Sequence, residues 1–415
     1  MVRRLLLLAT VLVGLAAPSA GEASPYIRYG VQDDAWLQYG PGTLSDRLDR
    51  LHSLGVDVVR VTLDWRQTEP KRGVDDWTRA DALLRGLHDR GIAPLVTLYG
   101  SPGWANGGRT EEWAPTGTST FAGFARRVAQ RYSFVHLWAI WNEPNQRRWL
   151  KPTSPRVYTT RLLNPAVAAL HRWSPGSQVA GGVTAPRGST GGVSPLDWIK
   201  GMRAAHAKLD AYAHNPYPLR PGETPSSGGC DHCTTVTMAT LPRLLSAVKR
   251  SFGAHTRVWL TEYGYQTNPP DRFLGVSYAK QARYSSEASL RSYLAPRVDL
   301  LIHYLVRDEP NPARWQSGLL TVGNLAKPSY QAFELPLAER SRSGRRTVLW
   351  GQVRPGGRSS YRLQQFRNGK WYAVGGSRST TARGYYTRVV RAGAGARFRI
   401  WSPPLHTYSR IVTVS

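Results

Sequence analysis

The sequence predicts a (β/α)8 barrel followed by a small all-β domain of the immunoglobulin-like sandwich type. Eight short runs of β-branched and apolar residues alternate with segments of helical period, which is the pattern of parallel strands joined by crossover helices. After about Arg340 short alternating runs follow, separated by Gly, Ser, Pro and Asn, as in antiparallel modules. With 415 residues, 41% of them hydrophobic, the chain can form both units, which we place at residues 25–338 and 341–415.

The eight expected barrel strands are separated by amphipathic segments. One has leucines at 44, 48, 51 and 54 and ends at Gly55, and another follows the capping candidates Thr118 and Ser119. The last helix is expected over residues 329–338. Eight βα units in about 310 residues fit a closed barrel, whereas an open doubly wound sheet usually has fewer strands. The strands are expected at residues 26–32, 56–65, 92–100, 134–145, 178–185, 210–218, 257–265 and 298–308.

Residues 1–24 have the pattern of an export signal peptide. Arg3 and Arg4 precede an apolar run from Leu5 to Ala17, and small residues up to Ala23 suit cleavage. No later apolar stretch approaches the ~20 residues of a membrane helix. We therefore expect a secreted protein without a membrane span, with association with the cell wall as an option.

The two cysteines, Cys230 and Cys233, lie in the loop sequence GGCDHC. An exported protein normally oxidises such a pair, so we expect a disulfide between them. A free or redox-active dithiol stays open, as does a zinc site that includes His232. The zinc site is less favoured because no second Cys/His cluster completes a tetrahedral ligand set.

The net charge of +28 is concentrated near the end of the chain, because residues 341–415 hold about fifteen Arg and Lys and no Asp or Glu. In an exported protein this charge suits anionic cell-wall polymers or acidic polysaccharides better than nucleic acid, for which no motif is present. A neutral-sugar site, a spacer and a basic surface that only aids solubility are the alternatives.

Two glutamates stand where barrel strands end, the position of reacting groups in this fold. Glu143 ends the fourth run within WNEPN, and Glu262 ends the seventh within LTEYG. Strands four and seven face each other across a closed eight-stranded barrel, so both carboxylates can reach one substrate. Five other acidic residues near strand ends fit subsite contacts or loop salt bridges better than catalysis: Asp33, Asp34, Asp64, Asp308 and Glu309.

On these residues the sequence resembles the clan of glycoside hydrolases with catalytic glutamates on strands four and seven. It is most similar to families 5 and 39 over roughly Tyr26 to Phe333. The resemblance implies that Glu143 is the acid/base and Glu262 the nucleophile. It also implies a substrate-binding set of Arg60, Trp104, Asn142, Asn215, Tyr217, Tyr304 and Trp315.

Two positions depart from the pattern of the clan. Where many relatives read His-Pro-Tyr on strand six, this chain has Asn215-Pro216-Tyr217, with His214 one residue earlier. Strand eight has Tyr304 in place of the Trp that often forms the floor of the sugar site. Tyr217 matches the tyrosine that orients the nucleophile, and the aromatic platform can be Tyr304, Trp315 or another ring.

The resulting hypothesis is a secreted glycosidase that degrades a polysaccharide or oligosaccharide by retaining, double-displacement hydrolysis at a β-linked O-glycosidic bond. The alternatives are a catalytically silent barrel that binds cell-wall glycan, and a transglycosylase that uses the same two glutamates. We find no GxSxG, HExxH, Walker or dinucleotide motif, and no cofactor or metal is expected.

Overall fold

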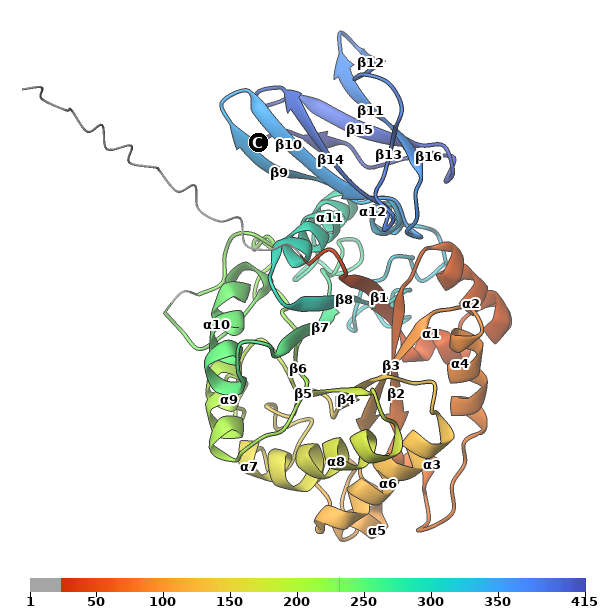
Figure 1. The fold of residues 1–415 in the computed structure, drawn as a ribbon, viewed down its shortest axis with the longest axis vertical. Coiled ribbons are helices and arrows are strands. Elements are labelled where there is room, and N and C mark those ends of the chain that lie inside the picture. The colour runs from red at the N-terminus through yellow and green to blue at the C-terminus, as the bar shows by residue number, and fades with distance from the viewer. Residues whose placement is uncertain (1–23, 231) are drawn as a thin grey trace, which may run out of the picture.

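The computed structural model describes residues 24–230 and 232–415, so the expected export signal lies outside the described residues except for Ser24. Eight parallel strands close into a barrel in which each strand pairs with the next and β8 returns to β1 (Figure 1). All eight predicted barrel strands are confirmed. They are β1 (Arg28–Gln32), β2 (Val58–Asp64), β3 (Ala93–Tyr99), β4 (Leu137–Ile140), β5 (Gln178–Thr184), β6 (Ala211–His214), β7 (Arg257–Tyr263) and β8 (Val298–Tyr304). No helix among the described residues is long and apolar enough to cross a membrane.

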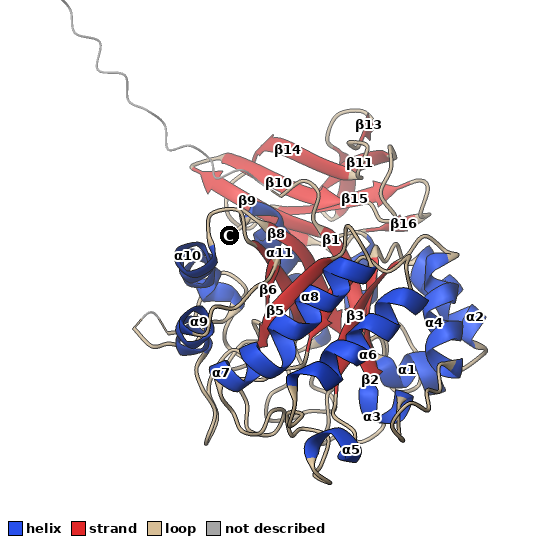
Figure 2. Cartoon of the chain, turned by 60° about the horizontal axis from the view of Figure 1, so that its bottom comes forward, coloured by secondary structure: helices blue, strands red, loops and turns tan. Residues whose placement is uncertain are grey.

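Helices surround the strands, as Figure 2 shows. The α2 helix illustrates why the sequence folds in this way: Thr43 and Asp46 form a capping box, Leu48 and Leu51 are buried, and Gly55 follows its end with φ 75°. The main helices are α1 (Asp34–Tyr39), α2 (Leu44–Ser53), α4 (Thr78–His88), α6 (Thr118–Arg131), α8 (Asn164–Trp173), α9 (Pro195–Ala204), α10 (Leu241–Phe252), α11 (Tyr278–Leu294) and α12 (Pro328–Glu334). Short turns α3 (Trp65–Thr68), α5 (Gly103–Asn106) and α7 (Pro155–Val157) lie in the loops.

The C-terminal module consists of two antiparallel sheets, in the orders β14-β10-β9 and β12-β11-β15-β16. They share an apolar core that includes Leu337, Leu349, Leu363, Phe398 and Ile400, so a sandwich is present. Its strands are β9 (Leu337–Ser343), β10 (Arg346–Gln352), β11 (Ser360–Arg367), β12 (Lys370–Ala373), β13 (Arg378–Ser379), β14 (Tyr385–Arg391), β15 (Arg397–Ser402), β16 (Thr407–Tyr408) and β17 (Val412–Thr413).

The predicted boundary between the two units is displaced. We expected the last barrel helix to continue to residue 338, but α12 ends at Glu334 and β9 begins at Leu337. Pro336 explains the early end because it cannot continue a helix and it disfavours helical backbone at the residue before it. The connection consists of Leu335 and Pro336, and both are buried.

The module packs tightly on the barrel at α11 and β1. Trp350 and Tyr385 lie 5.3 and 4.8 Å from the ring of Tyr293 on α11, and both belong to the apolar core of the barrel. The guanidinium of Arg354 lies 3.7 Å from the ring of Tyr29 and donates to the carbonyl oxygen of Phe333 at 2.7 Å. The two units therefore share a buried interface.

The structure does not contain the predicted disulfide: Cys230 and Cys233 are both free thiols. The backbone turn directs the Cys233 thiol toward the carbonyl oxygen of Cys230 at 3.6 Å, while the Cys233 amide donates to the Cys230 sulfur at 3.1 Å. Arg243 donates to the carbonyl oxygens of both cysteines and holds this turn. Within residues 24–230 and 232–415, no three His, Cys, Asp or Glu side chains gather as they would around a metal ion.

Candidate active site

The backbone at the end of β4 is strained in the segment that carries Glu143. Trp141 and Glu143 have φ values of 71° and 38°, in the left-handed region that L side chains seldom adopt. Neighbouring strands hold this conformation: the Trp141 amide donates to Leu98 on β3, and the Glu143 amide donates to Val183 on β5, each at 2.9 Å. The result is a fixed direction for the Glu143 side chain into the cavity above the barrel.

Glu262 is at the end of β7 and is 7% exposed. Arg60 on β2 donates to its Oε1 at 2.5 Å, and the hydroxyl of Tyr217 donates to its Oε2 at 3.1 Å. The Arg60 contact is charge-assisted and is therefore the stronger of the two hydrogen bonds. Arg60 and Tyr217, both members of the predicted substrate-binding set, thus contact Glu262.

Arg60 is buried at 1% exposure and connects four strands. Besides Glu262 it donates to Gln32 Oε1 on β1 at 2.8 Å, to Thr97 Oγ1 on β3 at 2.9 Å and to Asn142 Oδ1 at 2.8 Å. All these acceptors are polar and fixed, so the guanidinium is held in one orientation. The contact with Asn142 also fixes that side chain beside Glu143.

Glu143 has a different environment, although it shares the cavity with Glu262. Its Oε1 accepts one hydrogen bond, 3.1 Å long, from the side-chain amide of Asn215, whose own Oδ1 accepts from Thr261 at 2.8 Å. Burial, and then the negative charge of Glu262, raise the pKa of Glu143 to about 7, while the Asn215 contact and Arg148 oppose that shift. Glu143 is therefore protonated in a large fraction of molecules near neutral pH.

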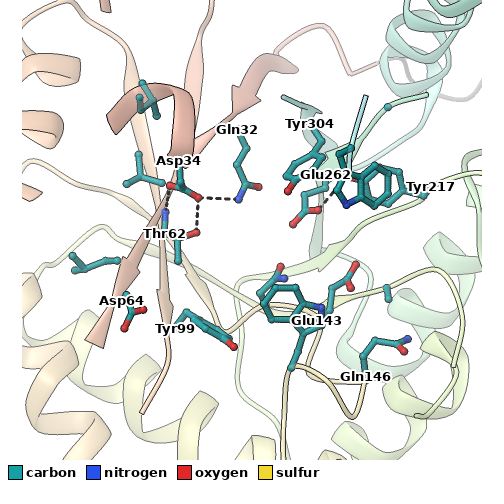
Figure 3. Close-up of a pocket in the computed structure, with 18 of the residues that line it drawn as sticks. Gln32, Asp34, Thr62, Asp64, Tyr99, Glu143, Gln146, Tyr217, Glu262 and Tyr304 are labelled. Carbon is teal, nitrogen blue, oxygen red and sulfur yellow. Dashed lines mark hydrogen bonds between the residues drawn. The ribbon is translucent and has the colours of Figure 1, made fainter. Parts of the chain in front are cut away.

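The cavity has a volume of about 1000 Å³, and both glutamates line it (Figure 3). Three predicted aromatic residues form one wall: the ring of Tyr217 lies 4.9 Å from Trp315 and 6.3 Å from Tyr304. A cavity of this size, with an aromatic wall and convergent polar groups, can hold several sugar rings. The residues that line it include Gln32, Asp34, Thr62, Asp64, Tyr99, Asn142, Glu143, Gln146, Arg148, Trp149, Tyr217, Glu262, Tyr304 and Trp315.

The structure does not bring Trp104 to this cavity, contrary to our prediction. The short α5 turn directs its ring against Trp65 at 5.5 Å in an edge-to-face contact, and its indole N–H donates to the carbonyl oxygen of Glu69 at 3.0 Å. Trp104 supports the loop after β3 from the core side. Trp149 and Tyr99 are aromatic residues that do line the cavity.

His214 is a structural residue. It is buried, it bonds Thr184 Oγ1 at 2.8 Å and the Val236 carbonyl oxygen at 3.1 Å, and burial lowers its pKa to about 4. The imidazole is therefore neutral and turned away from the glutamates. Asn215, the next residue, makes the contact with Glu143.

A second polar group lies on the opposite side of the cavity (Figure 3), and it contains Asp34, which the sequence placed among subsite contacts or loop salt bridges. Asp34 accepts from the amide of Thr62 at 2.9 Å, from its hydroxyl at 2.8 Å and from Gln32 at 3.3 Å (Figure 3). Asp34 and Asp64 line the cavity, as subsite contacts would. The signal for Asp34 was its position just after a strand.

Two of the other strand-end acids, Asp33 and Asp308, make structural contacts. Asp33 caps α1 and accepts from the amides of Val306 and Arg307 at 3.0 Å. Asp308 forms a buried ion pair with Lys327 at 2.7 Å. Glu309 is outside the cavity lining.

No protein-family model and no curated protein matches the chain. Solved structures do match. A family 39 glycoside hydrolase from Bacteroides cellulosilyticus WH2 aligns over 89% of this chain and 80% of its own, with a TM-score of 0.61 and 19% identity. The GH39 enzyme from Xanthomonas axonopodis pv. citri aligns over 89% and 92%, with a TM-score of 0.57 and 13% identity. The fold is that of these glycoside hydrolases.

A third structure, a GH5_18 variant from Streptomyces cattleya in complex with Manb1-4GlcNAc, aligns over 74% of this chain and 79% of its own, with a TM-score of 0.56 and 18% identity. The barrel makes up about three quarters of this chain, so the larger coverage by the two GH39 structures includes part of the module. The two-unit architecture is therefore shared with them.

Proposed function

We propose that this protein is a retaining β-glycoside hydrolase that cleaves an O-glycosidic bond in a polysaccharide or oligosaccharide. The observation that carries the proposal is the contrast between two carboxylates in one cavity. Burial and a like charge raise the pKa of Glu143 to about 7, whereas Glu262 accepts from Arg60 and Tyr217. Such a pair supplies a proton donor and a nucleophile together. The structural neighbours named as glycoside hydrolases support the same reaction class.

In the first step, Glu143 gives its proton to the glycosidic oxygen while the bond from that oxygen to the anomeric carbon breaks. Glu262 forms an ester bond to the same carbon, and the leaving sugar departs as an alcohol. Arg60 donates to the side-chain oxygen of Asn142 and so fixes that side chain. The NH2 group of Asn142 can then donate to the sugar hydroxyl next to the reacting carbon. This contact strengthens as positive charge develops on the sugar.

In the second step, Glu143 is ionised and takes a proton from water, whose oxygen attacks the anomeric carbon and releases Glu262. Burial raises the pKa of Glu143 most, and the charge of Glu262 raises it further. Since the ester carries no charge, this second contribution is absent in the second step. The returning Glu262 carboxylate is again stabilised by Arg60 and Tyr217. One change of charge thus converts Glu143 from acid to base. The expected export signal supports action outside the cell.

The stereochemistry of the first product tests this proposal. The purified protein is screened against aryl β-glycosides and a panel of glucan, xylan, mannan and galactan, and the anomer formed from an active substrate is followed by proton NMR. We expect the β-anomer to appear first, because two displacements retain the configuration. Early appearance of the α-anomer would show a single displacement by water, and no hydrolysis of any substrate would favour a glycan-binding barrel.

The pKa of Glu143 predicts the pH profile. We expect kcat/KM for a substrate with a poor leaving group to fall about tenfold per pH unit above about pH 7, because the required acid form of Glu143 is lost there. A dinitrophenyl glycoside is the matched control, since its leaving group needs little protonation and its rate should fall much less. Equal falls for both substrates would assign the basic limb to another group.

A further inference from the structure

The sheet with the order β12-β11-β15-β16, which we call the outer sheet of the module, presents arginines and aromatic rings on one face. Along β15, Phe398 and Ile400 point into the apolar core, so Arg397, Arg399 and Trp401 alternate to the opposite side. Phe366 on β11 is directly opposite Arg397. Trp371 on β12 is opposite Phe366, and Tyr408 on β16 is opposite Trp401. We call Phe366, Trp371, Arg397, Arg399, Trp401 and Tyr408 the arginine–aromatic face.

The arginines of this face are held against its rings. The guanidinium of Arg397 lies 3.8 Å from the centre of Phe366. Arg399 lies 4.2 Å from Trp371 and 3.7 Å from Tyr408, and its Nε donates to Gln364 at 2.8 Å. A guanidinium stacked in this way keeps most of its N–H donors at its edges, where a ligand can reach them.

The charge of these arginines is not neutralised. Residues 341–415 contain fifteen Arg and Lys and no Asp or Glu. Neither Arg397 nor Arg399 forms an ion pair with any carboxylate in the described part of the chain. The positive charges are therefore fixed in position and available to an anionic partner.

Most of this face lies away from the barrel. The other sheet, through Trp350 and Tyr385, contacts α11, whereas β11 and β12 project at the end of the module furthest from the barrel (Figure 1). The β16 edge of the sheet approaches the barrel, where Gln331 of α12 donates to Thr407 at 2.9 Å. Tyr408 is 36% exposed, and Trp371 and Trp401 are partly exposed. An extended ligand can therefore lie across these strands.

We propose that the arginine–aromatic face binds an anionic polysaccharide whose sugars carry carboxylate or sulfate groups. The edges of Arg397 and Arg399 pair with the anionic groups, and the exposed parts of Trp371 and Trp401 contact the apolar faces of the sugar rings. Residues 397 and 399 are about 6.8 Å apart along the strand, so they engage successive groups of a polymer. The site is separate from the catalytic cavity and does not depend on the proposed hydrolysis.

Binding of the full-length protein to polygalacturonate and dextran sulfate, measured by affinity electrophoresis with neutral dextran as reference, tests the proposal. We expect the double variant Arg397→Gln/Arg399→Gln to lose about tenfold or more in affinity for at least one of the two anionic polymers. The matched control is Arg346→Gln/Arg391→Gln, which removes the same charge from an exposed pair on the other sheet. It should lose less than about threefold, because distant charges are screened.

The variant Arg397→Lys/Arg399→Lys separates geometry from charge, since Lys keeps the charge but lacks the planar donor edge. It should bind more weakly than the parent, and melting curves check that every variant is folded. Equal losses in the two Gln pairs, or affinity for neutral dextran equal to that for both anionic polymers, would overturn the proposal. Affinity for a DNA duplex as high as for the anionic polysaccharides would show a general polyanion surface and would also overturn it.

Discussion

Replacing Glu262 by Gln should lower kcat/KM for an aryl β-glycoside by about four orders of magnitude or more, because an amide cannot form the covalent intermediate. Replacing Glu143 by Gln should lower kcat/KM by about 10²- to 10⁴-fold for a poor leaving group, the usual contribution of general acid catalysis. The two variants should differ in a diagnostic way. With a dinitrophenyl leaving group, Glu143→Gln should still form the glycosyl-enzyme, and azide should restore turnover by replacing the water that needs a base.

Glu309→Gln is the matched control for both variants. Glu309 also follows a barrel strand, but it is outside the cavity lining, so its loss should leave kcat/KM within about twofold of the parent. Near-parental hydrolysis by Glu143→Gln or Glu262→Gln would refute the assignment of the pair. Azide rescue of Glu262→Gln, with Glu143→Gln unaffected by azide, would exchange the two roles.

Replacing Trp350 by Ala should destabilise the whole chain by about 3–5 kcal/mol, the range for a buried Trp replaced by Ala. Trp350 is fully buried and packs against Tyr293 of the barrel and Tyr385 of the module. Because the barrel core includes this side chain, its loss should lower the stability of both units in one cooperative transition. Denaturant unfolding followed by fluorescence and by far-UV circular dichroism measures this effect.

Trp371→Ala is the control for that experiment, because Trp371 is a partly exposed indole on the outer sheet of the same module. It should cost about 1 kcal/mol or less. Two separate transitions, with the barrel transition unchanged in Trp350→Ala, would show that the interface does not couple the units. A chain that ends at Leu335 would then also be expected to fold.

The barrel could be predicted because each strand is buried on both faces and so appears as a compact apolar run between helical segments. The strand β9 could not be predicted from the sequence. Its second half, from Glu339 to Ser343, is polar and largely exposed, so its sequence resembles the end of a helix followed by a linker. Only pairing with β10 makes it a strand, and that pairing is a tertiary contact.

The two glutamates could be located because strand order fixes where the strands end. The hydrogen bonds that Arg60, Tyr217 and Asn215 make with these glutamates could be identified only from the structure. Trp104 follows β3 as we expected, yet a turn of four residues decides whether its ring points to the cavity or to Trp65, and the sequence carries no sign of that direction. Asp34 likewise depends on the side chains of Thr62 and Gln32, which come from two different strands.

The connection between α12 and β9 has a mechanical consequence. A catalytic domain on a long flexible tether searches a volume around its point of attachment, and the radius of that volume grows with tether length. Here the connection is two buried residues, Leu335 and Pro336, and the two units also pack on each other around Trp350. A protein bound to a polymer through its module would therefore hold its cavity at one distance and one angle from that polymer. It would reach bonds at that position and would have to dissociate before reaching others.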